Sequence, residues 1–518
     1  MEYRIEIGGT IIALLFSYYI FETLVSKWHI RQESKKHGCQ SPPRYPNKDL
    51  ILGLDLFIDN FRRMIKSNLL NTWVNRFQTY GNTFSAKVQT KHAICTVDAK
   101  NLQTVHALNF THYGVQPLLQ PPTLPFLGEG VFTMDGPFWE HSRALIRPTF
   151  TKSNVANLPA FEVHFQKFLA LVPTDGTKVN LKPLLNKLIF DTSTEFLFGD
   201  SMDTLSPETT FQTEECIAAF DYAIRGMGIR FQLGSLRFLY WDKKWYKSIK
   251  ITHSFADRYV DKAMEFRRSY LDAREGREKE KVEDSDSEEN DDNSNHRHVL
   301  LHEMAKQTGS RDDLQNQILH VLLVGHESSA ITIGNAIFHL CRNPEMWKKL
   351  RSEILSEGDK PFTFESLKDL QYLQFVIKET LHLHPVAPTD TRIALQDTIL
   401  PTGGGPQGTS PIFVKKGQIV FASFHALHML APCFQPDPAI FRPERWETVR
   451  PGWNYLPFIG GPRMCPGQNL ALTETAYVLA RMAQEWREIN CKDEVMEWVE
   501  LMTGVASSKN GIKVGVVV

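Results

Sequence analysis

Apolar residues recur at helical spacing along most of the chain and alternate at strand spacing in only a few short regions. The pattern predicts helices at residues 60–80, 139–147, 312–343 and 365–384, and mostly helical stretches at 161–197 and 210–274. It predicts strands within residues 83–97 and 393–420. Residues 115–135 are rich in Pro, Gly, Leu and Phe and indicate a long apolar loop. We therefore expect a mainly α fold with a small β region.

The helix predicted at residues 312–343 has an unusual middle. Asp312 or Asp313 can cap its start and Pro344 ends it, but the polar stretch 325–329 interrupts its apolar run. Within that stretch Glu327 and Ser328 place an acid and a hydroxyl in an otherwise buried segment, a combination that suits proton delivery. A polar kink that packs against another helix would give the same pattern, and the two interpretations stay open at this point.

The N-terminal region differs from the rest of the chain. Residues 7–25 are mostly apolar, close to the ~20 residues that a membrane-spanning helix needs, and Lys and Arg follow them. We predict an uncleaved membrane anchor at residues 1–30 rather than a signal peptide, with the downstream side in the cytosol. A basic, Pro-rich linker would follow at 31–48 and the main domain at 49–518, with an acidic insertion at 275–298 that we expect to be disordered.

Composition narrows the function classes. The 518 residues carry a formal net charge of −1, so the chain as a whole gives no reason to expect nucleic acid binding. Seven cysteines in a chain of this length do not form a disulfide framework, which fits a cytosol-facing body with reduced thiols.

The strongest chemical signal is a cysteine in a glycine-rich loop. Cys465 follows Phe458, Gly461 and Arg463 and precedes Gly467, in the pattern Phe-x-x-Gly-x-Arg-x-Cys-x-Gly, and a helix-like run begins directly afterwards. Backbone amides and the positive end of that helix would favour a thiolate at this position. The loop resembles the haem-ligand loop of the cytochrome P450 family.

The resemblance extends from about Pro42 to the C-terminus and implies a P450 fold, preceded here by the single transmembrane helix. It implies haem b with Cys465 as the axial ligand of the iron, and Trp139, Arg143, Arg392 and Arg463 near the haem propionates. It also implies a monooxygenase that uses O2 and a lipophilic substrate, in the endoplasmic reticulum membrane. Because the chain contains no reductase domain, the electrons would come from a separate NADPH-cytochrome P450 reductase.

Three positions depart from the family pattern, and the first is Val324, which stands where a small residue is usual. The stretch around Glu327 resembles the oxygen-activating helix of the family, but Ser328 stands where a threonine is usual. His382 replaces the arginine of the Glu-x-x-Arg motif that begins at Glu379, whereas Arg445 of the later Pro-Glu-Arg segment is present. We expect Glu379, His382 and Arg445 to form a buried network with fewer hydrogen bonds than the family's own, because histidine lacks the planar fork of an arginine.

Three stretches, 126–136, 194–200 and 400–405, are similar to fungal alkane and fatty-acid terminal hydroxylases. The resemblance suggests hydroxylation of a long-chain substrate in an apolar pocket. We expect this pocket to be lined by Leu118, Leu119, Phe126, Leu127, Val324 and Val505, with His326 meeting a polar group. Tailoring of a polyketide or terpenoid is the alternative within the enzyme class, and a haem protein that binds ligands or senses gas without turnover is the alternative outside it.

Overall fold

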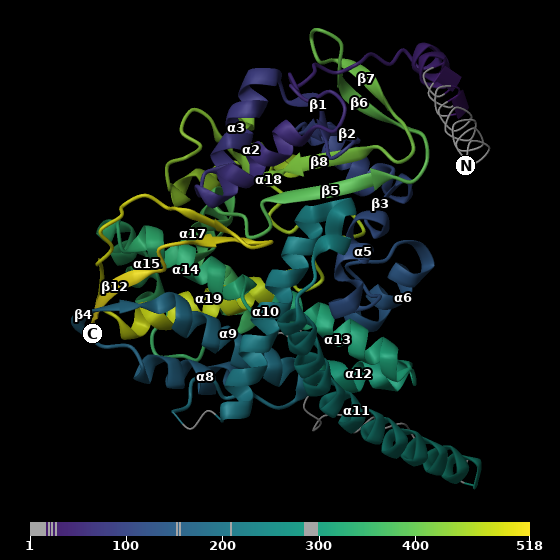
Figure 1. Cartoon of the computed structure of the whole chain (residues 1–518). Helices are drawn as coiled ribbons and strands as arrows, with labels where there is room; N and C mark the ends of the chain where they lie inside the picture. Colours follow the sequence, from purple (N-terminus) through teal and green to yellow (C-terminus); the bar gives the residue numbers. More distant parts are fainter. Residues whose placement is uncertain are drawn as a thin grey trace.

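The computed structural model describes residues 28–151, 157–207, 210–283 and 299–518, together with residues 17, 18, 21, 24, 25 and 154. It confirms a mainly helical chain with a small β region (Figure 1). In the first half the helices are α2 (Leu54–Ile65), α3 (Leu69–Tyr80), α4 (Ala99–Gln103), α5 (Gln116–Leu127), α6 (Gly136–Ile146), α8 (Leu158–Ala170), α9 (Leu181–Phe198), α10 (Phe211–Leu233) and α11 (Lys243–Glu283). In the second half they are α12 (Leu300–Gln307), α13 (Arg311–Gly325), α14 (Ser328–Leu340), α15 (Pro344–Ser356), α16 (Phe364–Asp369), α17 (Gln371–Leu383), α18 (Phe424–Leu430) and α19 (Gln468–Glu485).

Within the described residues the strands form one larger sheet and three small ones. The larger sheet has the order β1-β2-β8-β5-β3 and the three-stranded sheet the order β4-β12-β9, while β6-β7 and β10-β11 are pairs. The strands are β1 (Thr83–Val88), β2 (Lys91–Thr96), β3 (Tyr113–Gly114), β4 (Asp175–Asn180), β5 (Thr389–Ala394), β6 (Thr398–Gly404), β7 (Ser410–Val414), β8 (Ile419–Ser423), β9 (Glu488–Cys491), β10 (Glu500–Met502), β11 (Ala506–Ser508) and β12 (Lys513–Val517). In Figure 1 the larger sheet lies with α2, α3 and α18 at one end of the molecule, and the helix-rich part with α9, α14 and α19 fills the other.

The helix predicted at residues 312–343 is two helices. α13 and α14 are separated by His326 and Glu327, so the expected bend is a complete break. Ser310, not Asp312 or Asp313, caps the start, because its side chain accepts a hydrogen bond from the Asp313 amide. Pro344 lies beyond the helix end and begins α15, where its missing N–H costs no hydrogen bond.

The predicted loop at residues 115–135 is wrong, because much of it is the helix α5. Three prolines lie inside α5, and Pro125 has no N–H to give to the Pro121 carbonyl one turn back. Arg230 of α10 supplies the missing donor: its Nη2 reaches the Pro121 carbonyl at 3.4 Å and its Nε reaches the Pro122 carbonyl at 3.1 Å. A partner from a distant part of the sequence therefore allows a proline-rich helix here.

Other predicted boundaries also change. The helix predicted at 60–80 divides into α2 and α3 around Ser67, whose φ is +53°, and the helix at 365–384 divides into α16 and α17. α11 continues through Glu283 into the predicted acidic insertion, and residues 284–298 lie outside the described residues. The strands predicted within residues 83–97 are confirmed as the antiparallel pair β1 and β2.

Most of the predicted anchor at residues 1–30 lies outside the described residues, so the anchor and the domain boundaries stay predictions. Among the described residues, one stretch, Arg311–Leu340, which comprises α13 and α14, is long and apolar enough to cross a membrane. Of its apolar window 67% is buried inside the protein, which is how a core helix behaves.

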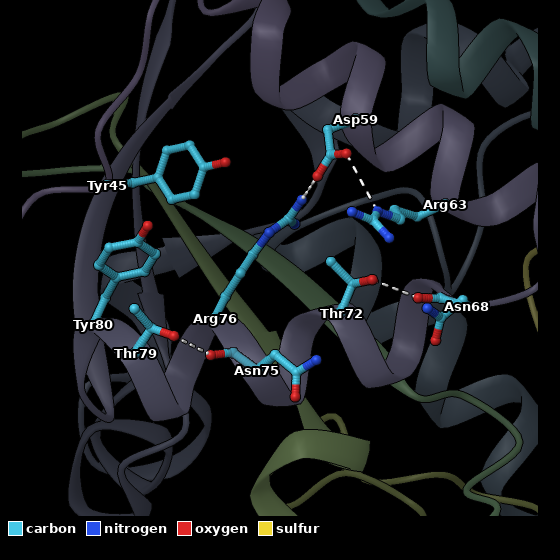
Figure 2. A pocket seen from close by; sticks show the side chains of 9 residues that line it. All are labelled: Tyr45, Asp59, Arg63, Asn68, Thr72, Asn75, Arg76, Thr79 and Tyr80. Carbon is cyan, nitrogen blue, oxygen red and sulfur yellow. Dashed lines mark hydrogen bonds and ion pairs between the residues drawn. The ribbon is translucent and has the colours of Figure 1, made fainter.

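A surface hollow of about 250 Å³ lies between α2 and α3 (Figure 2). Its walls are polar: Arg76 Nη2 contacts Asp59 Oδ2 at 2.6 Å, and Arg63 Nε contacts the other oxygen of Asp59 at 3.3 Å. It contains none of the residues that the sequence singled out, and we assign no ligand to it.

Candidate functional site

The cysteine loop is held by backbone contacts on both sides of Cys465. The Cys465 amide donates to the Phe458 carbonyl at 3.1 Å, and Gly467 stands at the N-cap of α19. Gly461 has φ +73°, and a Cβ there would lie 1.9 Å from the His106 carbonyl oxygen. The glycine is therefore required by backbone geometry and by close approach. Together these contacts present the Cys465 side chain from a fixed loop.

The expectation that the loop alone favours a thiolate is only partly met. Burial raises the pKa of the Cys465 thiol above its usual value, whereas the Gly467 amide and the nearby Arg143 lower it. The expected backbone amide is thus present and Arg143 adds to it, but burial has the larger effect on the pKa. A bound metal ion would add a positive charge that favours the thiolate form of Cys465.

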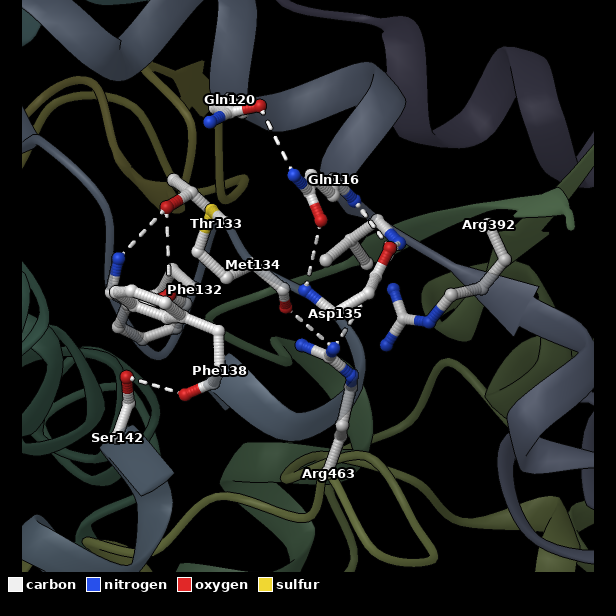
Figure 3. Close-up of polar contacts among 12 residues, drawn as sticks. Gln116, Gln120, Phe132, Thr133, Met134, Asp135, Phe138, Ser142, Arg392 and Arg463 are labelled. Carbon is white, nitrogen blue, oxygen red and sulfur yellow. Dashed lines mark hydrogen bonds and ion pairs between the residues drawn. The ribbon is translucent and has the colours of Figure 1, made fainter. Parts of the chain in front are cut away.

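Three predicted arginines come together above the loop. Arg143 Nη2 donates to the Met464 carbonyl at 2.9 Å, and its guanidinium lies 5.8 Å from the ring of Trp139. Arg463 lies over the same ring at 4.6 Å. Figure 3 shows the Arg463 and Arg392 guanidinium groups converging beside Asp135. The rim of the site is therefore cationic.

Two carboxylates already share this rim. Arg463 Nη2 donates to Asp135 Oδ1 at 2.6 Å and to the Met134 carbonyl at 2.7 Å, and Arg392 Nη1 donates to Asp390 Oδ1 at 2.5 Å. Arg463 Nε is nevertheless buried without a hydrogen-bond partner among the described residues. Because buried donors are almost always paired, this atom fits an anionic group such as a haem propionate. The residues present thus fit the group that the sequence predicts.

The break between α13 and α14 exposes polar groups in the middle of a buried segment. Ser193 of α9 donates to the Gly325 carbonyl at 3.0 Å, which satisfies a carbonyl that the break leaves free. Glu327 Oε1 lies 3.7 Å from His326 Nε2. Val324 is 40% exposed although its neighbours along α13 are mostly buried. The break therefore carries an acid and a hydroxyl, Glu327 and Ser328, next to an accessible apolar side chain.

Sequence reasoning missed Glu474 of α19. Ser329 Oγ donates to Glu474 Oε2 at 2.5 Å, and both side chains are buried. Burial raises the pKa of Glu474 to about 7, against the lowering by Ser329. The available signal was an acid, flanked by Thr473 and Thr475, inside the mostly apolar helix after Cys465. Glu474 and Ser329 therefore form a second acid–hydroxyl pair at the break between α13 and α14.

We predict that Glu474→Gln changes stability in a pH-dependent way. In the folded protein Glu474 keeps a proton up to about pH 7, whereas in the unfolded chain it loses it near 4.5. The contribution of this group to stability is therefore present at low pH and falls as pH rises from about 4.5 to 7. The glutamine variant should match the parent near pH 4.5 and exceed it above pH 7, by up to about 3 kcal/mol.

Urea unfolding of both proteins across this pH range measures the difference. Glu485→Gln, on the exposed surface of the same helix, is the control and should give no pH-dependent difference. Parallel pH curves for Glu474→Gln and the parent would contradict the prediction.

The predicted network around Glu379 forms without His382 as its partner. Glu379 accepts from Arg445 Nε at 3.0 Å, from the Arg442 amide at 2.8 Å and from Trp446 Nε1 at 2.9 Å. The predicted Glu379–His382 pairing is wrong, because His382 Nε2 instead contacts the Pro438 carbonyl at 2.9 Å and its ring lies 4.1 Å from Phe434. Burial lowers the pKa of His382 to about 3, so this side chain is neutral.

The predicted pocket residues come from three segments. Leu118 and Leu119 of α5 are half-buried, and α5 contacts α13, which carries Val324. Val505, between β10 and β11, is also half-buried, and β11 contacts α14. Phe126 and Leu127, by contrast, are packed in the hydrophobic core, where Phe126 contacts Phe220 of α10. Phe126 and Leu127 therefore lie behind the predicted pocket lining and are not accessible to a substrate.

Histidines at helical spacing are not a metal centre. His425 Nδ1 contacts the Leu383 carbonyl at 3.2 Å and His428 Nδ1 contacts the His382 carbonyl at 3.0 Å. Both are buried residues that contact carbonyls at the end of α17, so their side chains have structural roles. Among the described residues no group of three or more His, Cys, Asp or Glu side chains could hold a metal ion.

Comparison with known proteins identifies the family. Residues 43–516 match the sequence model of the family described as Cytochrome P450. The chain is 38% identical to cytochrome P450 monooxygenase himC of Aspergillus japonicus, over 97% of this chain and 88% of that protein. It is 36% identical to cytochrome P450 monooxygenase fsdH of Fusarium heterosporum, over 98% and 88% of the two chains, and 34% identical to cytochrome P450 52A12 of Debaryomyces hansenii, over 94% and 93%. The broken core helix, the fixed cysteine loop and these matches agree, and the chain belongs to the cytochrome P450 family of haem-thiolate monooxygenases.

Proposed function

We propose that the protein binds haem b through Cys465 and hydroxylates a lipophilic substrate, with a long-chain alkane or fatty acid as the first candidate. The observation that carries the proposal is the pairing of a fixed cysteine loop with the unpartnered donor of Arg463. The haem, when bound, would supply the iron that activates O2. Reduction of the purified protein under carbon monoxide tests the haem: the absorbance band of thiolate-ligated haem is expected, and its absence would overturn the proposal.

The side chains of this protein would divide the work around the haem. Cys465 would supply the thiolate from a loop shaped by Phe458, Gly461 and Gly467. Arg143 and Trp139, with Arg463 and Arg392, would receive the propionates, because an anion beside these guanidinium groups gains charge-assisted hydrogen bonds. At the break between α13 and α14, Glu327 and the Ser328 hydroxyl would relay protons.

We predict that Ser328→Thr reduces wasted turnover. Serine keeps the hydroxyl of the usual threonine but lacks the methyl group that restricts its rotamer, so the hydroxyl is less well held. Peroxide released per substrate oxidised should fall severalfold in the threonine variant. Ser356→Thr, at the exposed end of α15, is the control and should not lower peroxide release. An unchanged ratio for Ser328→Thr would count against the role of this hydroxyl.

The choice of substrate follows from the lining. The accessible Val324 and the half-buried Leu118, Leu119 and Val505 support a long aliphatic chain. A second candidate, tailoring of a polyketide or terpenoid, is favoured by polar groups at the same place. Asp221 of α10 is exposed and interacts electrostatically with His326 and Glu327. A substrate that carries a hydroxyl or amine would suit this acid and histidine better than a bare alkane.

A substrate panel separates the two candidates. Microsomes that contain the protein, NADPH-cytochrome P450 reductase and NADPH are incubated with alkanes, fatty acids and polyketide or terpenoid alcohols, and products are read by mass spectrometry. Terminal hydroxylation of the alkanes and fatty acids supports the first candidate. Oxidation of the alcohols alone supports the second. Controls without NADPH or with the Cys465→Ser variant identify products that do not depend on the enzyme.

We also infer that the body of the protein lies on the endoplasmic reticulum membrane, next to the predicted anchor. Four apolar residues at helical spacing on α2, Leu54, Ile58, Phe61 and Ile65, are exposed, which leaves an apolar stripe facing outward. A second exposed apolar group, from Leu236 to Trp241, follows α10, and Trp241 is 75% exposed. The two groups are neighbours, because Gln232 at the end of α10 contacts Met64 of α2 at 3.3 Å.

We predict that a form without residues 1–30 still binds lipid vesicles through this apolar surface. Replacing Ile58 and Trp241 together by Asp should release it, because charged side chains do not enter the apolar part of the interface. Co-sedimentation with vesicles of neutral phospholipid measures the bound fraction. The same double change at Val163 and Leu355, which are also exposed but lie elsewhere, is the control. Equal binding of all three proteins would contradict the proposed surface.

A further inference from the structure

A buried histidine connects the cysteine loop to the end of α17. His428 of α18 is fully buried, and its Nδ1 lies 3.0 Å from the His382 carbonyl oxygen. The last four carbonyls of a helix have no partner inside the helix, so His428 completes one of them at the end of α17. On its other side, His428 Nε2 lies 3.0 Å from the Leu456 amide, in the segment that leads into the cysteine loop.

These two contacts fix the protonation of the ring. The Leu456 amide can only donate, so Nε2 must be the acceptor. Nδ1 therefore carries the proton and donates to the His382 carbonyl. Burial keeps the pKa of His428 well below its usual value, which agrees with a neutral ring. His428 is thus a neutral bridge with one donor and one acceptor, each in use.

The segment that His428 holds is strained. The Ile459 amide donates to the Leu456 carbonyl at 3.3 Å, which closes a turn, and Ile459 has φ +62°. A β-branched residue in this left-handed region is a genuine outlier, and such a conformation persists only where the surroundings hold it. The residue before it, Phe458, accepts the hydrogen bond from the Cys465 amide. The hydrogen bond from Leu456 to His428 therefore lies at the base of the strained turn that positions Cys465.

A second contact attaches the same base to α17. The Tyr455 hydroxyl donates to the Lys378 carbonyl at 3.1 Å, and the ring of Tyr455 lies 5.2 Å from that of His428. Loss of His428 should therefore loosen the loop without freeing it completely. This arrangement leaves folding possible while the position of the cysteine changes.

We propose that His428 is a positioning residue for the haem ligand: its hydrogen bond to Leu456 holds the strained turn so that Cys465 stays on the iron. The proposal rests on the proposed function, since it needs a thiolate-bound haem. It concerns the lifetime of the iron–sulfur bond rather than the oxidation step, and so its readout is spectroscopic.

His425 provides a matched control for this proposal. Its Nδ1 contacts the Leu383 carbonyl at 3.2 Å at the same helix end, but among the described residues no contact joins it to the cysteine loop. His425→Phe and His428→Phe each remove one helix-end contact and keep an aromatic ring. Only His428→Phe removes the acceptor for Leu456. His428→Gln is the rescue variant, because its side-chain oxygen can reach the position of Nε2 and accept from Leu456.

The experiment follows the reduced, carbon monoxide-bound full-length holoprotein during incubation in mild urea. The rate at which the absorbance of thiolate-ligated haem converts to that of haem without the thiolate is measured. We expect His428→Phe to lose the thiolate about tenfold faster than the parent, the factor that corresponds to about 1.4 kcal/mol. His425→Phe should stay close to the parent, and His428→Gln should recover most of the difference.

Equal rates for the two phenylalanine variants, or no recovery in His428→Gln, would overturn the proposal and leave His428 as one more helix-end contact. If His428→Phe purifies without haem while His425→Phe retains it, the proposal is supported by haem content instead. If the parent protein itself shows no absorbance band of thiolate-ligated haem, the proposed binding of haem through Cys465 is wrong. That outcome is distinct from a parent band that the histidine changes do not affect.

Discussion

Replacing Cys465 by serine should abolish both the thiolate-haem absorbance and all substrate oxidation. A serine hydroxyl is a hard, weakly basic ligand, and it cannot push electron density onto the iron as a thiolate does. The loop itself should survive, because its hydrogen bond from residue 465 to Phe458 uses the backbone. We therefore expect a folded protein whose oxidation falls to the background of the assay.

Cys491→Ser is the matched control for this change. Cys491 is also a free, partly exposed cysteine, but it lies on β9, in a different part of the fold. Its replacement should leave the carbon monoxide spectrum and product formation unchanged. Product formation by Cys465→Ser at the parent's rate would show that the iron, if present, is held elsewhere.

Replacing Glu379 by alanine should have the largest effect on stability. It removes the partner of Arg445 and leaves a buried guanidinium without its carboxylate, along with the lost contacts to Trp446 and the Arg442 amide. Breaking a buried ion pair from one side typically costs about 3–5 kcal/mol. Because burial raises the pKa of Glu379 to about 7, the comparison belongs at about pH 8, where the carboxylate is ionised.

Glu444→Ala is the control, from the same Pro-Glu-Arg segment. Glu444 makes an exposed ion pair with Lys349 at 2.8 Å, and such pairs contribute about 0–1 kcal/mol. Urea unfolding of both variants, with haem content measured alongside, gives the comparison. A loss for Glu379→Ala no greater than that for Glu444→Ala would contradict the importance of the buried network.

The parts of the site that could be predicted from sequence depend on local chemistry. The spacing of Phe458, Gly461 and Cys465 describes one tight loop, and the loop forms through contacts among these neighbours. Trp139 and Arg143 are four residues apart on one helix, so helical geometry alone brings them together. Fold class followed in the same way, from the long helical periodicity.

The parts that could not be predicted depend on partners far away in the sequence. α5 is helical because Arg230 of α10 donates hydrogen bonds to two of its carbonyls. The pattern of residues within 115–135 gives no sign of that distant contact. Glu474 becomes a site residue only when α19 packs beside Ser329. His382 was assigned to Glu379 by spacing, but the Pro438 carbonyl, 56 residues away, offers the better partner.

The contact between Arg230 and α5 has a consequence for engineering this enzyme. The guanidinium of Arg230 joins α10 to α5 through the Pro121 and Pro122 carbonyls. It also lies 5.1 Å from the ring of Trp245 at the start of α11. Residues 115–135 grafted from a relative with a different substrate would therefore need a hydrogen-bond donor at the position of Arg230 that suits their own carbonyls. Chimeras that transplant Arg230 and its tryptophan together with the segment should express as soluble, haem-loaded protein more often than chimeras that exchange the segment alone.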